Sequence, residues 1–271
     1  VFTYSVAPRF ELSDHASVYA RVASGYRPGG PNVIPAGSPA GVPATYDADR
    51  LTNWELGFKA EAPDGRRWSL EVVAYHIDWK NIQIFARVNN TGINDNGGKA
   101  RVNGLEVSGA LRPVPGLTLS ANGAYTDGEL KEDTPPVTGG LKGDPLPWVP
   151  RWSGGLHADY EFPMGTGVGG FVGASLTYVG KRTAEFGERY FGGPRDGDLE
   201  RIPSYTEVDL RAGVDLDRFR IEAFAQNLFD KRGITDAFGF PDATGNSFPG
   251  GAAGVAITRP RTIGLTATVN Y

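Results

Sequence analysis

The feature that most constrains this chain is a hydrophobic period of two residues that recurs along its whole length. Residues 262–271 show it most clearly, because Ile263, Leu265, Ala267, Val269 and Tyr271 are apolar and the residues between them are Thr, Gly or Asn. Successive side chains of a β-strand point to opposite faces, so each such segment predicts a strand with one apolar and one polar face. About eleven segments of this kind predict an all-β fold.

The connections between these segments alternate between short and long. The short ones are residues 13–15, 62–66, 113–116, 163–167 and 216–218, and the long ones are residues 27–50, 86–98, 127–148, 180–201 and 230–258. In an up-and-down antiparallel sheet, this alternation places every short turn at one end and every long loop at the other. Outer-membrane barrels have such unlike rims, with short periplasmic turns and longer extracellular loops.

The residue types on the two faces favour a barrel in a membrane over a soluble β-sandwich. The polar face is mostly Thr, Ser, Asn and Gly with scattered charges, which suits a wet lumen. Aromatic residues fall at the ends of the segments, where interfacial girdles would place them: Trp54, Tyr125, Trp152, Phe162, Tyr178 and Tyr271. No run of 18 apolar residues occurs, but a membrane-spanning strand needs only about 9–11 residues. We therefore expect an up-and-down antiparallel transmembrane β-barrel.

Composition excludes several other functions. The net charge is −4, which argues against a nucleic-acid partner, and the absence of cysteine excludes disulfides, zinc–thiolate sites and thiol catalysis. Residues 165–170, GTGVGG, match the G-x-G-x-x-G pattern of dinucleotide sites. That pattern needs a following helix, and here an alternating segment follows, so we interpret it as a tight turn. We expect no cofactor and no metal site.

Six segments carry a family resemblance. They are SVYARVASGYRPGG (17–30), LTNWELGFK (51–59), VNGLEV (102–107), WVPRW (148–152), QNLFDKR (226–232) and the final alternating segment that closes on Tyr271. In order and spacing they resemble the C-terminal half of the barrel of TonB-dependent outer-membrane receptors, over essentially the whole of residues 1–271.

The resemblance implies a barrel of about 22 strands around an N-terminal plug domain, a plugged-lumen size. About eleven strands are predicted here, and neither the plug nor the energy-coupling TonB box is visible in this chain. We expect residues 1–271 to be the C-terminal part of such a barrel. A small complete barrel is the alternative.

The resemblance also implies a function in the outer membrane of a Gram-negative bacterium. The receptor would take up a scarce solute, with a ferric siderophore as the leading candidate, and would not be an enzyme. Its implied partners are the TonB–ExbB–ExbD complex through the absent plug region, outer-membrane lipid, and the barrel-assembly machinery through the C-terminal strand. The alternatives are a passive porin and a barrel-embedded hydrolase, in which His157 would act with neighbouring residues.

Two groups of residues are candidates for the site. In the long loops, arginine and aromatic side chains would suit an anionic, partly aromatic iron chelate, although they could equally be rim charges and interfacial anchors. These are Arg27, Trp148, Arg182, Arg189, Tyr190, Phe191 and Arg195. The lumen or plug-facing candidates are His157, Asp159, Glu207, Asp209, Arg211, Arg220 and Glu222. Pairing within the barrel wall and docking of the plug are both open as roles for this second group.

Overall fold

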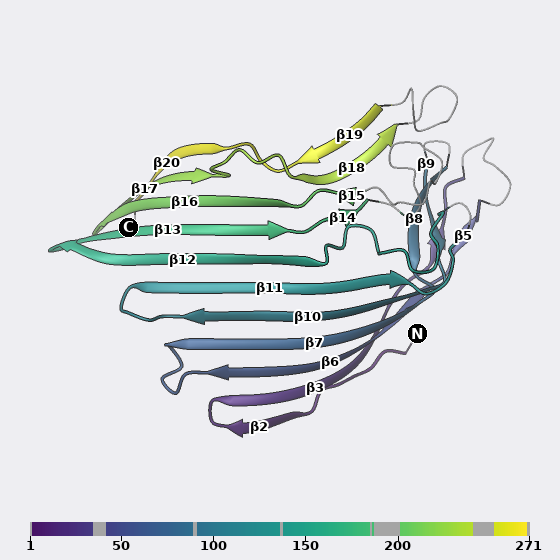
Figure 1. The fold of residues 1–271 in the computed structure, drawn as a ribbon, viewed down its shortest axis with the longest axis horizontal. Coiled ribbons are helices and arrows are strands. Elements are labelled where there is room, and N and C mark those ends of the chain that lie inside the picture. The colour runs from purple at the N-terminus through teal and green to yellow at the C-terminus, as the bar shows by residue number, and fades with distance from the viewer. Residues whose placement is uncertain are drawn as a thin grey trace.

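A single curved antiparallel sheet makes up most of the molecule (Figure 1). The computed structural model describes residues 2–34, 42–88, 91–135, 138–184, 186, 201–240 and 252–269. Nearly every strand of the sheet pairs with the next one along the chain, which gives the predicted up-and-down order. The strands are β1 (Ser5–Val6), β2 (Arg9–Ser13), β3 (Ala16–Arg27), β6 (Asp49–Glu61), β7 (Trp68–Lys80), β10 (Lys99–Leu111), β11 (Leu117–Leu130), β12 (Trp152–Gly165), β13 (Val168–Val179), β16 (Tyr205–Leu216), β17 (Phe219–Gln226) and β20 (Thr262–Val269).

Within the described residues the sheet contains twelve strands where about eleven were predicted, because the first predicted strand is divided in two. Both β1 and β2 pair with β3, and the break between them falls at Ala7 and Pro8. Proline has no N–H to donate to a strand ladder, so the ladder is interrupted there. Each half keeps the alternation that predicted one strand.

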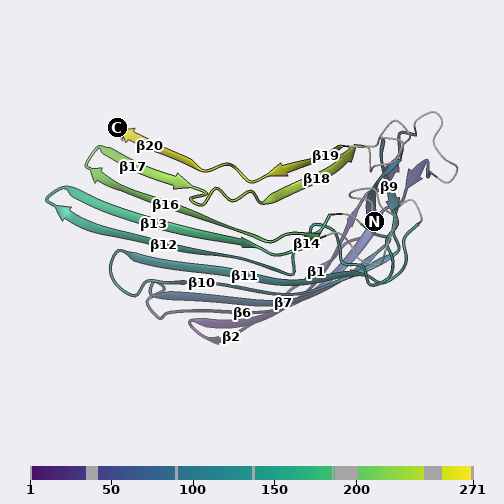
Figure 2. The same cartoon turned by 45° about the horizontal axis from the view of Figure 1, so that its top comes forward.

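The long loops contain further strands that the sequence did not predict. In the part of the loops that the structure describes, four short antiparallel pairs lie at the loop end of the sheet (Figures 1 and 2): β4 (Gly30–Pro31) with β5 (Thr45–Tyr46), β8 (Gln83–Val88) with β9 (Thr91–Asn96), β14 (Arg182–Thr183) with β15 (Arg201–Ile202), and β18 (Ile234–Phe240) with β19 (Ala252–Ile257). The short turns lie together at the opposite end, as predicted. The sequence did not predict these loop strands because segments such as TGINDN have little apolar alternation.

Cross-strand register separates the two faces of the sheet. On one face, which we call the inner face, Lys59 lies opposite Glu71, Glu71 opposite Ser108, and Ser108 opposite Asn122. The other face, the outer face, carries rows such as Leu56, Ala74, Leu105, Tyr125 and Trp152. The outer apolar side chains are open to the surroundings, with Leu56 62% and Leu265 79% exposed. An apolar surface of this extent marks contact with a membrane or a partner.

The buried core lies on the inner face near the loop end, where loop segments fold over the strands. Ile82, Ile84, Leu130, Leu146 and Phe186 pack there against other buried and half-buried side chains. Those partners are Tyr75, Ile77, Trp79, Ala100, Val102 and Val149. The packing explains why residues 68–79 are apolar on both faces toward that end: the inner-facing side chains are covered by loops there and not by water.

Glycines of the sheet are matched to aromatic rings on the next strand. The Tyr75 ring lies across Gly104, where an added Cβ would come within 2.1 Å of it, and the Tyr19 ring lies across Gly57 in the same way at 2.0 Å. Phe171 covers Gly213 on the neighbouring strand. A side chain at these positions would displace the ring, which accounts for the glycines of the 51–59 and 102–107 segments.

Across the described residues, no helix has the length and apolar character that crossing a membrane requires.

Candidate functional site

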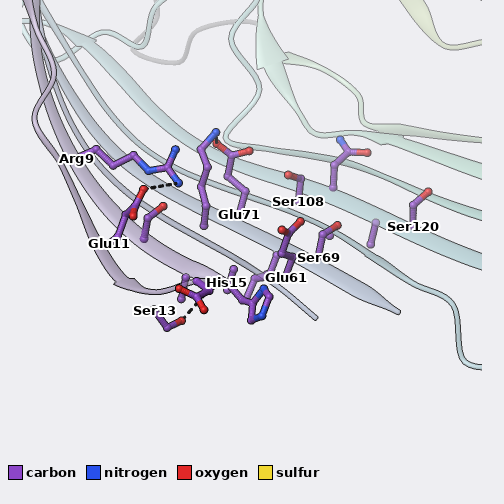
Figure 3. A pocket seen from close by; sticks show the side chains of 18 residues that line it. Arg9, Glu11, Ser13, His15, Glu61, Ser69, Glu71, Ser108 and Ser120 are labelled. Atoms are coloured by element: carbon purple, nitrogen blue, oxygen red, sulfur yellow. Dashed lines mark hydrogen bonds and ion pairs between the residues drawn. The ribbon is translucent and has the colours of Figure 1, made fainter. Parts of the chain in front are cut away.

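The inner face is hollowed near the short-turn end and lined by polar side chains (Figure 3). The hollow has a volume of about 740 Å³ and is bordered by β2, β3, β6, β7, β10 and β11. Lys59 and Glu71 form an ion pair of 2.7 Å across β6 and β7, and Arg9 lies 3.9 Å from Glu11 on β2. Ser108 and Ser120 extend the polar lining toward the middle of the sheet. The lining can therefore hydrogen-bond water or a polar protein surface.

Charged residues of the 207–222 region form a ladder on the inner face. The Arg211 guanidinium pairs with Asp159 of β12 and reaches Glu222 of β17 at 3.6 Å. Arg220 pairs with Asp215 at 2.9 Å and lies 3.8 Å above the buried Phe171 ring. Four of the seven lumen candidates thus have oppositely charged partners in this ladder: Asp159, Arg211, Arg220 and Glu222.

The other three lumen candidates share the inner face but are less tightly engaged. Asp209 accepts hydrogen bonds from the Ser175 hydroxyl at 3.3 Å and from the Asn227 backbone N–H at 2.7 Å. His157 stands opposite Ser120 and Ser175, and Glu207 stands opposite Thr177.

Among the described residues, the side chains around His157 do not form a hydrolase triad. Asp159, the carboxylate nearest to it in sequence, is held by Arg211. The structure gives His157 no hydrogen bond within the part of the chain that it describes. Among those residues, no group of three His, Asp or Glu side chains is arranged to hold a metal ion.

At the loop end, Arg27 is part of a network centred on the buried carboxylate of Asp49, which is 1% exposed. Asp49 accepts hydrogen bonds from the Arg27 backbone N–H at 3.0 Å and Nε at 2.8 Å, from Trp79 Nε1 at 3.0 Å, and from the Gln83 backbone N–H at 3.3 Å. The guanidinium of Arg27 also lies 4.9 Å over the Trp79 ring. We call these four residues the Asp49 anchor.

The anchor perturbs the ionisation of its carboxylate. Asp49 lies at the loop end of β6, beyond Trp54 and beyond the apolar rows of the outer face. Burial acts to raise the pKa of Asp49, but the hydrogen bonds from the Arg27 side chain and from the backbone N–H groups of Gln83 and Arg27 outweigh it and lower that pKa below its usual range. The carboxylate is therefore charged at neutral pH, as its cationic partner requires.

Side-chain amides join the first two long loops to each other. Gln83 Nε2 donates to the carbonyls of Pro28 at 2.9 Å and Asp47 at 3.0 Å. Asn96 Nδ2 donates to the Asp47 carbonyl at 3.0 Å, and Asn32 Nδ2 donates to the Asn94 carbonyl at 2.7 Å. Sequence reasoning missed these residues because single amides in loops have no periodic signal.

Arg182 and Trp148, which are 34 residues apart in the sequence, are brought together. The Arg182 guanidinium is buried, lies 5.5 Å from the Trp148 ring and 5.7 Å from the Tyr205 ring, and donates to the carbonyls of Gly180 and Ile234. This arrangement fixes the base of two loops. The remaining loop candidates lie outside the described residues: Arg189, Tyr190, Phe191 and Arg195.

The QNLFDKR segment forms a network of hydrogen bonds between the end of β17 and the start of β20. Asn227, which is buried and has φ of 48°, donates through Nδ2 to the carbonyls of Lys231 at 2.9 Å and Arg259 at 2.7 Å. Asp230 accepts the Arg261 backbone N–H at 2.9 Å. These contacts explain why the motif contains Asn and Asp at these spacings.

Comparisons with known proteins agree with this architecture. A family model described as "TonB dependent receptor-like, beta-barrel" matches residues 1–228. The chain is 27% identical to the pesticin receptor of Yersinia pestis over 267 residues, which are 97% of this chain and 35% of that protein. It is also 27% identical to the metal-pseudopaline receptor CntO of Pseudomonas aeruginosa, covering 97% of this chain and 32% of that protein.

A solved structure shares the fold. The ferric yersiniabactin uptake receptor FyuA of Yersinia pestis superposes with a TM-score of 0.76 and 25% identity, covering 98% of this chain and 37% of the receptor. The ferripyoverdine receptor of Pseudomonas aeruginosa, at 18% identity, has the same fold with a TM-score of 0.67. The chain spans about one third of the length of the curated relatives that it matches.

Proposed function

Because this chain belongs to the family of TonB-dependent receptor β-barrels, we propose that it forms part of an outer-membrane receptor that takes up a ferric siderophore. The observation that carries the proposal is the family match over residues 1–228 on a sheet with a polar inner and an apolar outer face. The names of the relatives add support, since they include receptors for pesticin, for metal-pseudopaline and for ferrioxamine B.

The proposal assigns the twelve-stranded sheet to the wall of a larger barrel. Within the described residues the sheet is open, with β20 at one edge and, at the other, β1 and β2, which both pair with β3. Backbone groups without a partner in hydrocarbon cost several kcal/mol each, so both edges need further strands beside them. A plug domain would then dock against the polar inner face, where the hollow and the Arg211 ladder supply hydrogen-bonding and charged groups.

Energy coupling and assembly follow from the same assignment. The TonB–ExbB–ExbD complex would act on the plug region, and the barrel-assembly machinery would recognise the C-terminal strand, whose outer face carries Ile263 and Leu265. The outer membrane of a Gram-negative bacterium is the location that such a receptor requires. No bond-making chemistry is needed, because the barrel acts as a scaffold and as part of the binding site.

For ligand capture, the geometry divides the loop candidates. Arg27, Trp148 and Arg182 already have partners within the chain, which supports an anchoring role for them. We assign chelate contact to the 189–195 segment, whose Arg189, Tyr190, Phe191 and Arg195 offer charge and stacking surfaces to an anionic aromatic ligand.

The test is uptake of radioactive iron by cells that lack the whole gene and by cells in which it is restored. Hydroxamate and catecholate chelates are supplied singly, with and without a protonophore. We expect the restored gene to recover uptake of at least one chelate, and the protonophore to abolish that uptake. Diffusion of small solutes that persists under the protonophore, with no chelate taken up, would replace the proposal with a passive porin.

Two variants sharpen the result. Alanine at the four residues of the 189–195 segment should raise the chelate concentration needed for half-maximal uptake while the surface amount of protein stays constant. Lys142→Ala, at an exposed position of another loop, is the matched control. His157→Ala should leave uptake unchanged, and loss of a hydrolase activity in that variant would favour the enzyme reading.

A further inference from the structure

Four basic side chains lie in a line on the outer face at the loop end of the sheet. Arg50 of β6 is directly opposite Lys80 of β7, and Lys80 is directly opposite Lys99 of β10. Lys131, which follows β11, donates its backbone N–H to the Lys99 carbonyl at 2.8 Å and extends the line. We call Arg50, Lys80, Lys99 and Lys131 the basic row. Directly opposite residues have Cβ atoms about 4.5–5.5 Å apart, and like charges at that spacing destabilise a sheet.

Carboxylates of this chain neutralise only half of the row. Lys99 pairs with Glu132 at 2.7 Å, and Lys131 pairs with Glu129. Within the described part of the chain, no carboxylate pairs with Arg50 or Lys80, and both side chains are exposed. Among the described residues, the two adjacent charges of Arg50 and Lys80 therefore remain without a carboxylate partner at one end of the row.

The row stands just outside the apolar band of the outer face. Trp54 shares a strand and a face with Arg50. Tyr125 and Trp152 lie on that face with ring centroids 4.8 Å apart and ring planes tilted by 54°. Four residues of strand separate Trp54 from Arg50, about 13 Å at the rise of a strand. Tryptophan and tyrosine mark the headgroup level of a membrane, and long basic side chains bend back toward that level.

We propose that the basic row binds the phosphate groups of an anionic lipid in the leaflet that surrounds the loop end of the barrel. This inference rests on the proposed function, in which the long loops of the barrel lie on the extracellular side of the outer membrane. Arg50 and Lys80 supply positive charge that can neutralise the negative charge of a phosphate group. An arginine can also bind phosphate with two parallel hydrogen bonds. Below the row, the acyl chains of the same lipid would lie on the apolar surface around Leu56, Ala74 and Leu105.

The experiment measures lipid binding by the full-length protein in detergent, using native mass spectrometry. The probes are lipid A with two phosphates, its one-phosphate form, and inorganic phosphate. We expect the two-phosphate lipid to bind more tightly than the one-phosphate lipid, and inorganic phosphate not to compete at equal concentration. Arg50→Gln with Lys80→Gln should weaken lipid binding about 30-fold, since each basic residue near an anionic surface contributes about 1 kcal/mol.

Arg66→Gln with Arg218→Gln is the matched control, because it removes two exposed arginines at the short-turn end and changes the net charge equally. Equal weakening by both double variants, or competition by inorganic phosphate alone, would overturn the lipid assignment.

A single substitution separates binding from folding. Lys80→Glu places a carboxylate between Arg50 and Lys99, so it should stabilise the barrel against heat while it abolishes lipid binding. Unchanged lipid binding in a stable Lys80→Glu protein would refute the inference. Iron uptake is measured in parallel. Loss of lipid binding in a variant that still takes up iron would leave the proposed function intact. Absence of iron uptake by the wild type would count against the proposed function and not against the lipid site.

Discussion

Replacing Asp49 by alanine should loosen the loop end of the barrel while the strands below it stay intact. The carboxylate is the shared acceptor for donors from β3, from β7 and from the start of β8, so its removal affects three segments at once. The change leaves the backbone of β6 in place. The expected result is therefore local opening of the Asp49 anchor and not global unfolding.

The magnitude follows from the donors that lose their acceptor. The Arg27 side chain is 50% exposed and can be rehydrated, so its loss counts little. Trp79 Nε1 and the Gln83 N–H lie in a half-buried environment, and an unsatisfied buried donor costs about 1–3 kcal/mol. A combined cost of about 3 kcal/mol corresponds to an opening equilibrium roughly 100-fold more favourable.

Hydrogen–deuterium exchange of the full-length protein in detergent measures this opening. The amides of Arg27 and Gln83 should exchange about 100-fold faster in Asp49→Ala, while those of the 102–109 segment keep their wild-type rates. Asp47→Ala is the control, because that side chain is exposed and only its backbone enters the network. An acceleration of less than about tenfold, under 1.4 kcal/mol, would refute the anchor as the source of loop order.

The anchor should also depend on pH in a defined direction. Because the pKa of Asp49 is lower in the folded protein than in the unfolded chain, its contribution is fully present above the ordinary carboxyl range of about 4. It is lost as the pH falls through the lowered folded value. Protection of the Gln83 amide should therefore stay constant from about pH 7 to pH 5 and fall only below about pH 4. A loss near pH 6 would point to a different titrating group.

Two further pairs of substitutions test the packing and the two faces of the sheet. Gly104→Ala should lower the stability of the folded protein by about 1–3 kcal/mol, because its Cβ would displace the Tyr75 ring. Gly123→Ala should lower it far less, since the nearest neighbour of an added Cβ lies at 3.8 Å. The temperature at which each variant loses its compact migration on a gel compares the two. Leu156→Arg, on the outer face between the aromatic ends of β12, should cost about 2–4 kcal/mol, while Ser120→Arg on the inner face should assemble normally, as the amount of folded protein in outer membranes will report.

The strands and the two rims were predictable because they depend on local alternation. Leu56 and Lys59 lie on opposite faces of the sheet because their positions in the sequence differ by an odd number. A face of one character requires the same period of two along the whole strand. The interruption at Pro8 could also be read from the residue itself. The loop hairpins could not, because segments such as TGINDN pair through backbone groups that every residue carries.

The candidate site was less predictable. Arg27 stood out as a loop arginine, but its partner Asp49 lies 22 residues away and Gln83 lies 56 residues away. The same holds for Arg182, whose contact with Ile234 spans 52 residues. Contacts at such separations depend on how loops pack over the sheet, and no periodicity encodes that packing.

The neighbour-to-neighbour order of the sheet bears on how the chain acquires its shape. β1 pairs with β3 although β2 lies between them in the sequence. Every other pairing in the large sheet joins strands that follow each other along the chain within that sheet. Each added strand therefore closes only the loop before it, and the entropy lost on closure does not grow with the number of strands already in place. Assembly can proceed one hairpin at a time along the growing edge, with a low contact order at every step.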